Sequence, residues 1–186
     1  MKKLLPFLML LLLTSCGTKK FYTLGENLKI KNEIRYTETI EVVQVSVPRY
    51  LQEYKIVKQI TPRQVELIKK AQWLVPMEER LTEILIDYLQ QSLNNPNVHL
   101  YPWDADNEPK KRVSVEIKKF IASSEEVMLI ANYKVMDFTN NTKQQKSFRS
   151  SINTDGSMEG MMSSMEKVYL ELLSEIKVTL LSNKGV

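Results

Sequence analysis

The sequence of 186 residues contains only one cysteine, one histidine and five glycines. A single cysteine excludes an intramolecular disulfide framework and any zinc or iron–sulfur site that needs several cysteines. The single histidine, His99, likewise excludes a metal site built from several imidazoles. The glycines are scattered without phosphate-binding spacing, and no serine lies in a nucleophile-elbow context. These absences disfavour an enzyme.

The sequence also lacks a long hydrophobic run and a strong excess of charge. Its longest apolar stretch, Leu4 to Leu13, is interrupted by Pro6 and would rise only about 15 Å as a helix, half of a hydrocarbon core. The stretch therefore predicts a secretory signal and not a transmembrane span. The formal net charge is +4, and it falls to +2 without the first fifteen residues. This balance predicts no nucleic-acid partner.

A lipidation signal follows the apolar stretch. Residues 13–16 read Leu-Thr-Ser-Cys, which resembles the bacterial lipobox. The resemblance implies cleavage between Ser15 and Cys16, with an S-diacylglycerol and an N-acyl group on Cys16 and no other cofactor. A plain signal peptide with an incidental cysteine is the alternative. Gly17 after the cysteine resembles the sorting signal of Gram-negative outer-membrane lipoproteins, which implies the periplasmic face of the outer membrane.

The remaining chain predicts one domain. We expect a cleaved signal peptide over residues 1–15, a lipidated cysteine and short tether over 16–20, and a single periplasmic domain over 21–186. Apolar alternation predicts strands over 39–47, 54–60, 98–101, 112–121, 127–138 and 143–153, the last three as an antiparallel meander. Residues 64–74 leave strand and helix open. Helical periodicity predicts amphipathic helices over 77–93 and 158–181. This order predicts an α+β fold, with a largely antiparallel sheet and two helices packed on one face.

Few side chains could carry chemistry. His99 is expected to be an ordinary residue at the surface or on an edge strand. Asp104, Asp106 and Glu108 could bind Ca²⁺ weakly, but a solvated acidic loop is the preferred interpretation. No metal site is therefore predicted.

Methionines and tryptophans offer further candidates. Four methionines cluster where the last helix is predicted to begin, and they could fill the core or contact a lipid or a partner. They are Met158, Met161, Met162 and Met165. Trp73 and Trp103 are expected to be partly buried anchoring residues.

Three short motifs resemble a known family. Residues 45–51 end a predicted strand in Val-Ser-Val-Pro-Arg-Tyr-Leu, residues 72–77 read Gln-Trp-Leu-Val-Pro-Met before the first helix, and residues 21–24 read Phe-Tyr-Thr-Leu. Their order and spacing resemble the ABC-type transport auxiliary lipoprotein family, to which the PqiC-type proteins belong. The positions that match are Pro48, Tyr50, Leu51, Trp73 and Pro76. We expect Tyr50, Leu51 and Trp73 to shape a corner of the fold rather than to contact substrate.

The resemblance implies a non-enzymatic role. Members accompany ABC transporters that use MCE-domain proteins to move lipid between the two membranes, and they dock or stabilise the periplasmic MCE assembly. The partner would be an MCE-domain protein, reached by strand addition or by a homo-oligomeric ring around an MCE tube. Two alternatives stay open: an outer-membrane lipoprotein that activates a peptidoglycan synthase, and a lipid-binding lipoprotein of envelope assembly. The first usually has a long tether, whereas the second needs an apolar cavity.

Overall fold

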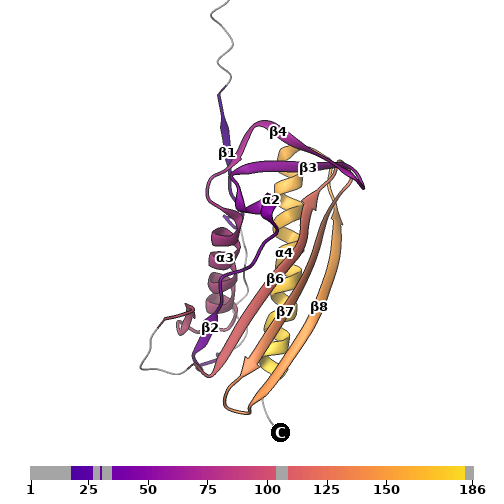
Figure 1. Ribbon diagram of the computed structural model, residues 1–186. Helices are drawn as coiled ribbons and strands as arrows, with labels where there is room; N and C mark the ends of the chain where they lie inside the picture. Colours follow the sequence, from indigo (N-terminus) through magenta and orange to yellow (C-terminus); the bar gives the residue numbers. More distant parts are fainter. Residues whose placement is uncertain (1–17, 27–29, 31–34, 104–108, 183–186) are drawn as a thin grey trace, which may run out of the picture.

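The computed structural model describes residues 18–26, 30, 35–103 and 109–182. The signal peptide, Ser15, Cys16 and the acidic residues Asp104, Asp106 and Glu108 therefore lie outside the described residues. Figure 1 shows how the elements are arranged. In chain order they are β1 (Lys20–Tyr22), β2 (Ile40–Val42), α2 (Arg49–Gln52), β3 (Lys55–Thr61), β4 (Gln64–Trp73), α3 (Met77–Ser92), β5 (Val98–Leu100), β6 (Lys111–Ala122), β7 (Glu126–Asp137), β8 (Thr142–Asn153) and α4 (Met158–Ser182).

β6 organises the eight-stranded sheet (Figure 1). Along one edge it pairs antiparallel with β7, which pairs antiparallel with β8, so the predicted meander is confirmed. Along its other edge, residues 111–113 pair parallel with β2, whereas Ala122 pairs parallel with β3. β5 lies beyond β2, and β4 and β1 lie beyond β3. The α+β class is confirmed, but the sheet is mixed, because β1, β2, β3 and β5 each have a parallel neighbour.

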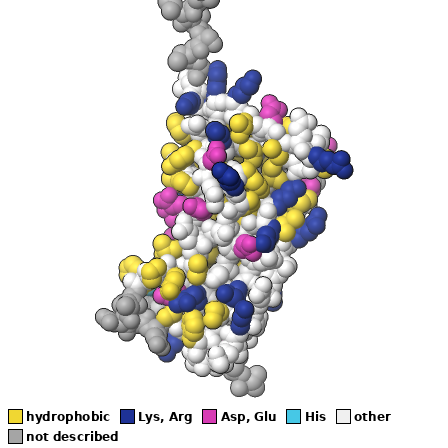
Figure 2. Space-filling model, in the orientation of Figure 1, with side chains coloured by type: hydrophobic (Ala, Val, Ile, Leu, Met, Phe, Trp, Pro, Cys, Tyr) yellow, Lys and Arg dark blue, Asp and Glu magenta, His cyan; other side chains and the backbone are white. Residues whose placement is uncertain are grey.

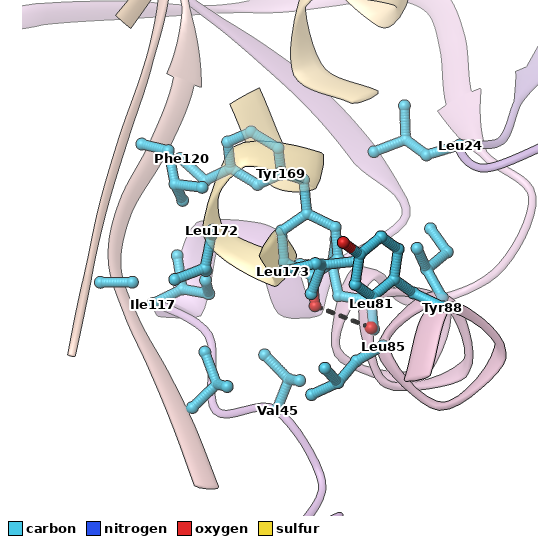
Figure 3. Packing of buried hydrophobic residues seen from close by; sticks show 14 of the residues in the cluster. Leu24, Val45, Leu81, Leu85, Tyr88, Ile117, Phe120, Tyr169, Leu172 and Leu173 are labelled. Carbon is cyan, nitrogen blue, oxygen red and sulfur yellow. Dashed lines mark hydrogen bonds between the residues drawn. The ribbon is translucent and has the colours of Figure 1, made fainter. Parts of the chain in front are cut away.

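Helices α3 and α4 cover one face of the sheet, as expected, and the core lies between the two layers (Figure 1). Figure 3 shows aliphatic and aromatic side chains from both helices meeting those of β6. Two buried tyrosines tie the elements together, one joining the two helices and the other joining the sheet to α4. The hydroxyl of Tyr169 in α4 donates a 2.8 Å hydrogen bond to the carbonyl of Leu81 in α3, and the hydroxyl of Tyr133 in β7 donates a 2.7 Å bond to Glu175 in α4. Burial raises the pKa of Tyr133 to about 12.

The strand predicted over 39–47 is shorter in the structure. Only β2 forms a continuous ladder, and the following residues leave it because the backbone N–H of Val45 donates a 2.9 Å hydrogen bond to the Thr82 hydroxyl of α3. Ser46 returns to the sheet as an isolated bridge with Glu116. Val45 and Val47 are buried, whereas Val43 is only half-buried.

Residues 64–73, which the sequence left open, form strand β4. Lys70 has a positive φ of 62°, and the β3–β4 register shifts at this point. The irregularity changes which side chains face outward. Before Lys70, Val65 and Leu67 are 59% and 51% exposed, whereas Trp73 after it is 2% exposed. A single strand therefore contributes both to a surface and to the core.

Candidate functional site

The two ends of β6 define the two ends of the molecule. With twelve residues, β6 is about 40 Å long. β1, β3 and β4 lie at its carboxyl-terminal end, beside the point where the amino-terminal tail leaves, and β2, β5 and the β7–β8 turn lie at the other end (Figure 1). Each end carries exposed apolar side chains, and these two surfaces are the candidate sites for binding.

The amino-terminal segment is held firmly against the domain. β1 pairs parallel with the last residues of β4, and the backbone N–H of Leu74 donates a 2.8 Å hydrogen bond to the Tyr22 carbonyl. The Arg80 Nε of α3 donates a 2.7 Å bond to the carbonyl of buried Leu24. Gly25, whose φ is +85°, donates its N–H to Glu166 of α4 at 2.7 Å. The chain that contains the Phe-Tyr-Thr-Leu motif of residues 21–24 is thus fixed to both helices.

Pro48, Tyr50 and Leu51 form a corner between the sheet and α3. Pro48 immediately precedes α2, and Leu51 of α2 is 2% exposed. The Tyr50 hydroxyl accepts a 2.9 Å hydrogen bond from the Phe120 N–H and donates a 3.3 Å bond to the carbonyl of the same residue. Burial raises the pKa of Tyr50, although the hydrogen bond from the Phe120 N–H acts in the opposite direction. Tyr50 therefore satisfies both backbone groups of one β6 residue.

Trp73 and Pro76 lie where β4 leads into α3. Pro76 precedes the helix, and Glu78 and Glu79 occupy its first turn, where the helix dipole favours negative charge. The backbone N–H of Trp73 donates a 2.7 Å hydrogen bond to the Tyr54 carbonyl. The indole N–H of Trp73 is buried without an acceptor among the described residues. Trp73 is therefore held in place by its backbone and by packing.

The methionine cluster lies where α4 begins. Met161, Met162 and Met165 belong to the buried core, and Met158 is partly buried against it. Met158 and Met161 also line a groove between α4 and the β3–β4 hairpin, together with Ile60 and Leu67. Contact of this cluster with a lipid or a partner stays a prediction.

The end beside the amino-terminal tail exposes apolar residues among basic ones (Figure 2). We call it the hairpin surface, and it comprises Phe21, Ile60, Val65, Leu67 and Leu74, each 48–59% exposed. Because β1 pairs only with residues 71–73 of β4, the outer edge of the rest of β4 has no strand beside it in the described part of the chain. An exposed strand edge with apolar side chains is a candidate contact surface.

The opposite end exposes a second group, the aromatic end, which consists of Leu100, Tyr101, Trp103 and Phe138 (Figure 2). The guanidinium of Arg112 lies 4.1 Å from the Tyr101 ring centroid and 5.1 Å from that of Phe138. Glu41 accepts a 2.9 Å hydrogen bond from Arg112 and holds it in this position. The aromatic end is therefore a built cluster and not a set of isolated side chains.

The expectation that Trp103 is partly buried is wrong. Trp103 is 63% exposed, and its ring stacks on His99 with centroids 4.3 Å apart. His99 is half-buried on β5, an edge strand of the sheet, as expected. Trp103 follows the short strand β5 and does not belong to the buried core. It is available to an incoming partner instead.

A buried ion pair fixes the aromatic end to the sheet. The Lys111 ammonium lies 2.8 Å from the Asp137 carboxylate, and both side chains are 2% exposed. Asn140 donates two further hydrogen bonds of 3.0 Å to this carboxylate. Burial alone would raise the pKa of Asp137, but the Lys111 and Asn140 hydrogen bonds outweigh it and hold that pKa below its ordinary value. The pair joins the start of β6 to the β7–β8 turn.

The described residues form two exposed apolar surfaces, which are the candidate binding surfaces of this fold. Among the described residues, no group of three or more His, Cys, Asp and Glu side chains is placed to hold a metal ion. None of the helices in that part of the chain is long and apolar enough to cross a bilayer. The fold and its surfaces define an α+β domain with a candidate contact surface at each end.

Comparison with known proteins identifies the family. Residues 22–177 match the family described as ABC-type transport auxiliary lipoprotein component. The chain therefore belongs to the ABC-type transport auxiliary lipoprotein family. Membership makes it an auxiliary lipoprotein component of ABC-type transport, in keeping with a location in the cell envelope. No curated protein matches the sequence.

Solved structures show the same fold. The protein XCC0632 from Xanthomonas campestris is 11% identical, with a TM-score of 0.69 over 84% of this chain and 92% of that one. A second crystal structure, of an uncharacterized protein, is 17% identical, with a TM-score of 0.70 over 88% of this chain and 99% of that one. At these identities the likeness extends to the fold alone.

Sequence reasoning missed both contact surfaces. It assigned Val65 and Leu67 to an undecided segment, and it gave Tyr101 and Phe138 no role. One signal was available: Val65 and Leu67 have exposed charged neighbours in Glu66 and Lys69. No local signal places Phe138 beside Tyr101, because they meet only through the pairing of β2, β5, β6 and β7.

Proposed function

We propose that this protein is an outer-membrane lipoprotein that docks the periplasmic MCE assembly of an ABC-type lipid transporter. It would be anchored by acyl chains on Cys16 at the periplasmic face. The observation that carries the proposal is the two-ended construction of the domain. The chain runs from the proposed anchor into one end, and the aromatic end lies at the other, about 40 Å away along β6.

The aromatic end has the composition of a protein contact. Aromatic residues and arginine are enriched at the centres of protein interfaces, and tryptophan, tyrosine and arginine contribute most to binding there. Tyr101 and Phe138 flank Arg112, whose position is set by Glu41, and Trp103 stacks on His99 of the same end. A domain tethered at its other end would present this cluster to an assembly that approaches across the periplasm.

Two alternatives are less well supported. A peptidoglycan synthase activator usually needs a long tether, but only three residues separate Cys16 from β1. A lipid carrier needs an enclosed cavity, whereas side chains from the sheet and both helices fill the space between the layers in the described residues. A homo-oligomeric ring around an MCE tube remains part of the proposal, because identical subunits would multiply a weak contact at each aromatic end.

Affinity capture from detergent-solubilised envelopes of the native host tests the proposal. The full-length protein with an affinity sequence at its carboxyl terminus should recover an MCE-domain protein. A W103A/F138A variant should recover much less, and V178S, which changes an exposed valine of α4, should recover as much as the unaltered protein. Recovery of peptidoglycan synthases without MCE-domain proteins would contradict the proposal.

A further inference from the structure

The hairpin surface lies close to the membrane if Cys16 carries the anchor, and this inference rests on that part of the proposed function. From Cys16 to Lys20, the first residue of β1, the chain makes four residue steps, which span at most about 15 Å. β1 is in turn paired with β4, and Leu24 and Gly25 just after it are hydrogen-bonded to α3 and α4. The domain therefore cannot move its β1–β4 end far from the bilayer.

Before residue 71, where its pairing with β1 begins, β4 has no strand on its outer edge in the described part of the chain. In Figure 1, β3 and β4 cross the end of the molecule at which β1 lies, in keeping with the strand order β1-β4-β3-β6. Val65 and Leu67 are 59% and 51% exposed on β4, and Phe21 is 59% exposed on β1. Exposed apolar groups of this size gain free energy when they enter an apolar medium. The bilayer that holds the anchor is the nearest such medium.

Charge is distributed unequally between this end and the rest of the protein. Residues 19–24 and 53–74 contain seven Lys and Arg and two Asp and Glu, a net charge of +5. The remainder of the chain after residue 15 has 17 basic and 20 acidic residues, a net charge of −3. Arg63 and Lys69 form no ion pair with another described residue. A surface of anionic phospholipid complements this end and repels the other.

We propose that the hairpin surface is a second, non-covalent membrane contact. Phe21, Val65 and Leu67 lie at the level of the lipid headgroups, and Arg63 and Lys69 bind phosphate groups of anionic phospholipid. The contact fixes the orientation of the domain, so that the aromatic end points away from the membrane. A protein strand pairing with β4 is the less favoured occupant, because lysines on an exposed edge oppose strand addition.

Depth measurement on the acylated protein tests this contact. The chain has one cysteine, which acylation blocks, so the L67C variant has a single free thiol for a fluorescent label. V178C places the same label on an equally exposed residue of α4 as the matched control. Both proteins are reconstituted into vesicles of phosphatidylethanolamine and phosphatidylglycerol. Quenchers attached to lipid headgroups should quench the label at residue 67, and a water-soluble quencher should quench the label at residue 178.

Neutralising charge tests the lipid specificity. Each basic group beside an anionic surface strengthens binding about fivefold. R63Q/K69Q should therefore shift the equilibrium about 25-fold toward the orientation in which the hairpin surface has left the membrane while the anchor stays inserted. K110Q/K143Q, which removes two exposed lysines at the other end, should leave the immersion of the residue 67 label unchanged. Vesicles of phosphatidylcholine alone should reproduce the effect of R63Q/K69Q.

The outcomes separate this contact from the anchor. A protein that does not float with the vesicles contradicts the anchor and this contact together. A protein that floats while its residue 67 label remains in water contradicts the contact alone. Self-quenching between labels at residue 67, independent of lipid composition, would show that a second copy covers the hairpin surface, and this too would overturn the proposal.

Discussion

The Lys111 ammonium and the Asp137 carboxylate form an ion pair of 2.8 Å, with both side chains 2% exposed. The pair joins the start of β6 to the end of β7, next to the aromatic end. Removing one partner of a buried pair leaves the other as an uncompensated charge, which typically destabilises by about 3–5 kcal/mol. We expect D137N to lose that much at neutral pH in urea denaturation, whereas N140A should lose much less. Equal stability of D137N and the unaltered protein would contradict this role.

Acid should weaken the same pair. The pKa of Asp137 is lower in the folded protein than in the unfolded chain. As the pH falls, the unfolded state therefore binds the proton first, and the contribution of Asp137 is complete above about pH 4 to 5 and is lost below it. The unaltered protein should lose more stability between neutral pH and about pH 3 than D137N does. Parallel losses in the two proteins would show that other groups dominate acid unfolding.

Substitution of Trp73 should lower the thermal stability of the protein, whereas substitution of Trp103 should leave it unchanged. Trp73 is 2% exposed, and truncating a buried aromatic residue costs about 3–5 kcal/mol. W73A should lower the melting temperature by roughly 10 °C in a domain of this size. W103A, at 63% exposure, should leave the melting temperature within error of the unaltered protein. Unchanged stability of W73A together with lost partner binding would contradict its structural role.

Tyr50 should act as a structural clamp on β6. Y50F keeps the ring but leaves the Phe120 N–H without the hydroxyl that accepts its hydrogen bond at 2.9 Å. An unsatisfied buried donor costs about 1–3 kcal/mol, and we expect that loss in thermal or chemical unfolding. Y54F is the control, since Tyr54 is 51% exposed. A Y50F protein as stable as Y54F would show that water replaces the hydroxyl without cost.

Cys16 should determine the cellular location of the protein. C16A removes the thiol that would be acylated, so the membrane fraction should lose the protein. Mass spectrometry of the unaltered protein should show an acylated cysteine at the amino terminus, with residues 1–15 absent. An unmodified, membrane-released protein would instead support the plain signal peptide.

The strands with regular alternation could be predicted from the sequence. β7 buries every second residue, from Val127 through Val135, because one side faces α4 and the other does not. β4 could not be predicted in this way. Lys70 adopts a positive φ and interrupts the alternation, so Val65 and Leu67 point outward before it and Trp73 points inward after it.

The candidate site could be predicted only in part. The corner at Pro48, Tyr50 and Leu51 follows from local motifs and a family resemblance, and the family match covers it. The aromatic end joins Tyr101 to Phe138 through Arg112, and these residues are far apart in the sequence. Such a cluster exists only after β6 has paired with both β2 and β7. Periodicity and composition contain no information on that pairing.

The most direct test of docking is site-specific photo-crosslinking in living cells of the native host. A photoreactive amino acid at position 103 should crosslink to an MCE-domain protein, because Trp103 is the most exposed residue of the aromatic end. The same group at position 178 should give no such crosslink. An MCE crosslink from position 103 alone is the result that the account predicts. Crosslinks from position 103 to a peptidoglycan synthase, with none to an MCE-domain protein, would contradict it.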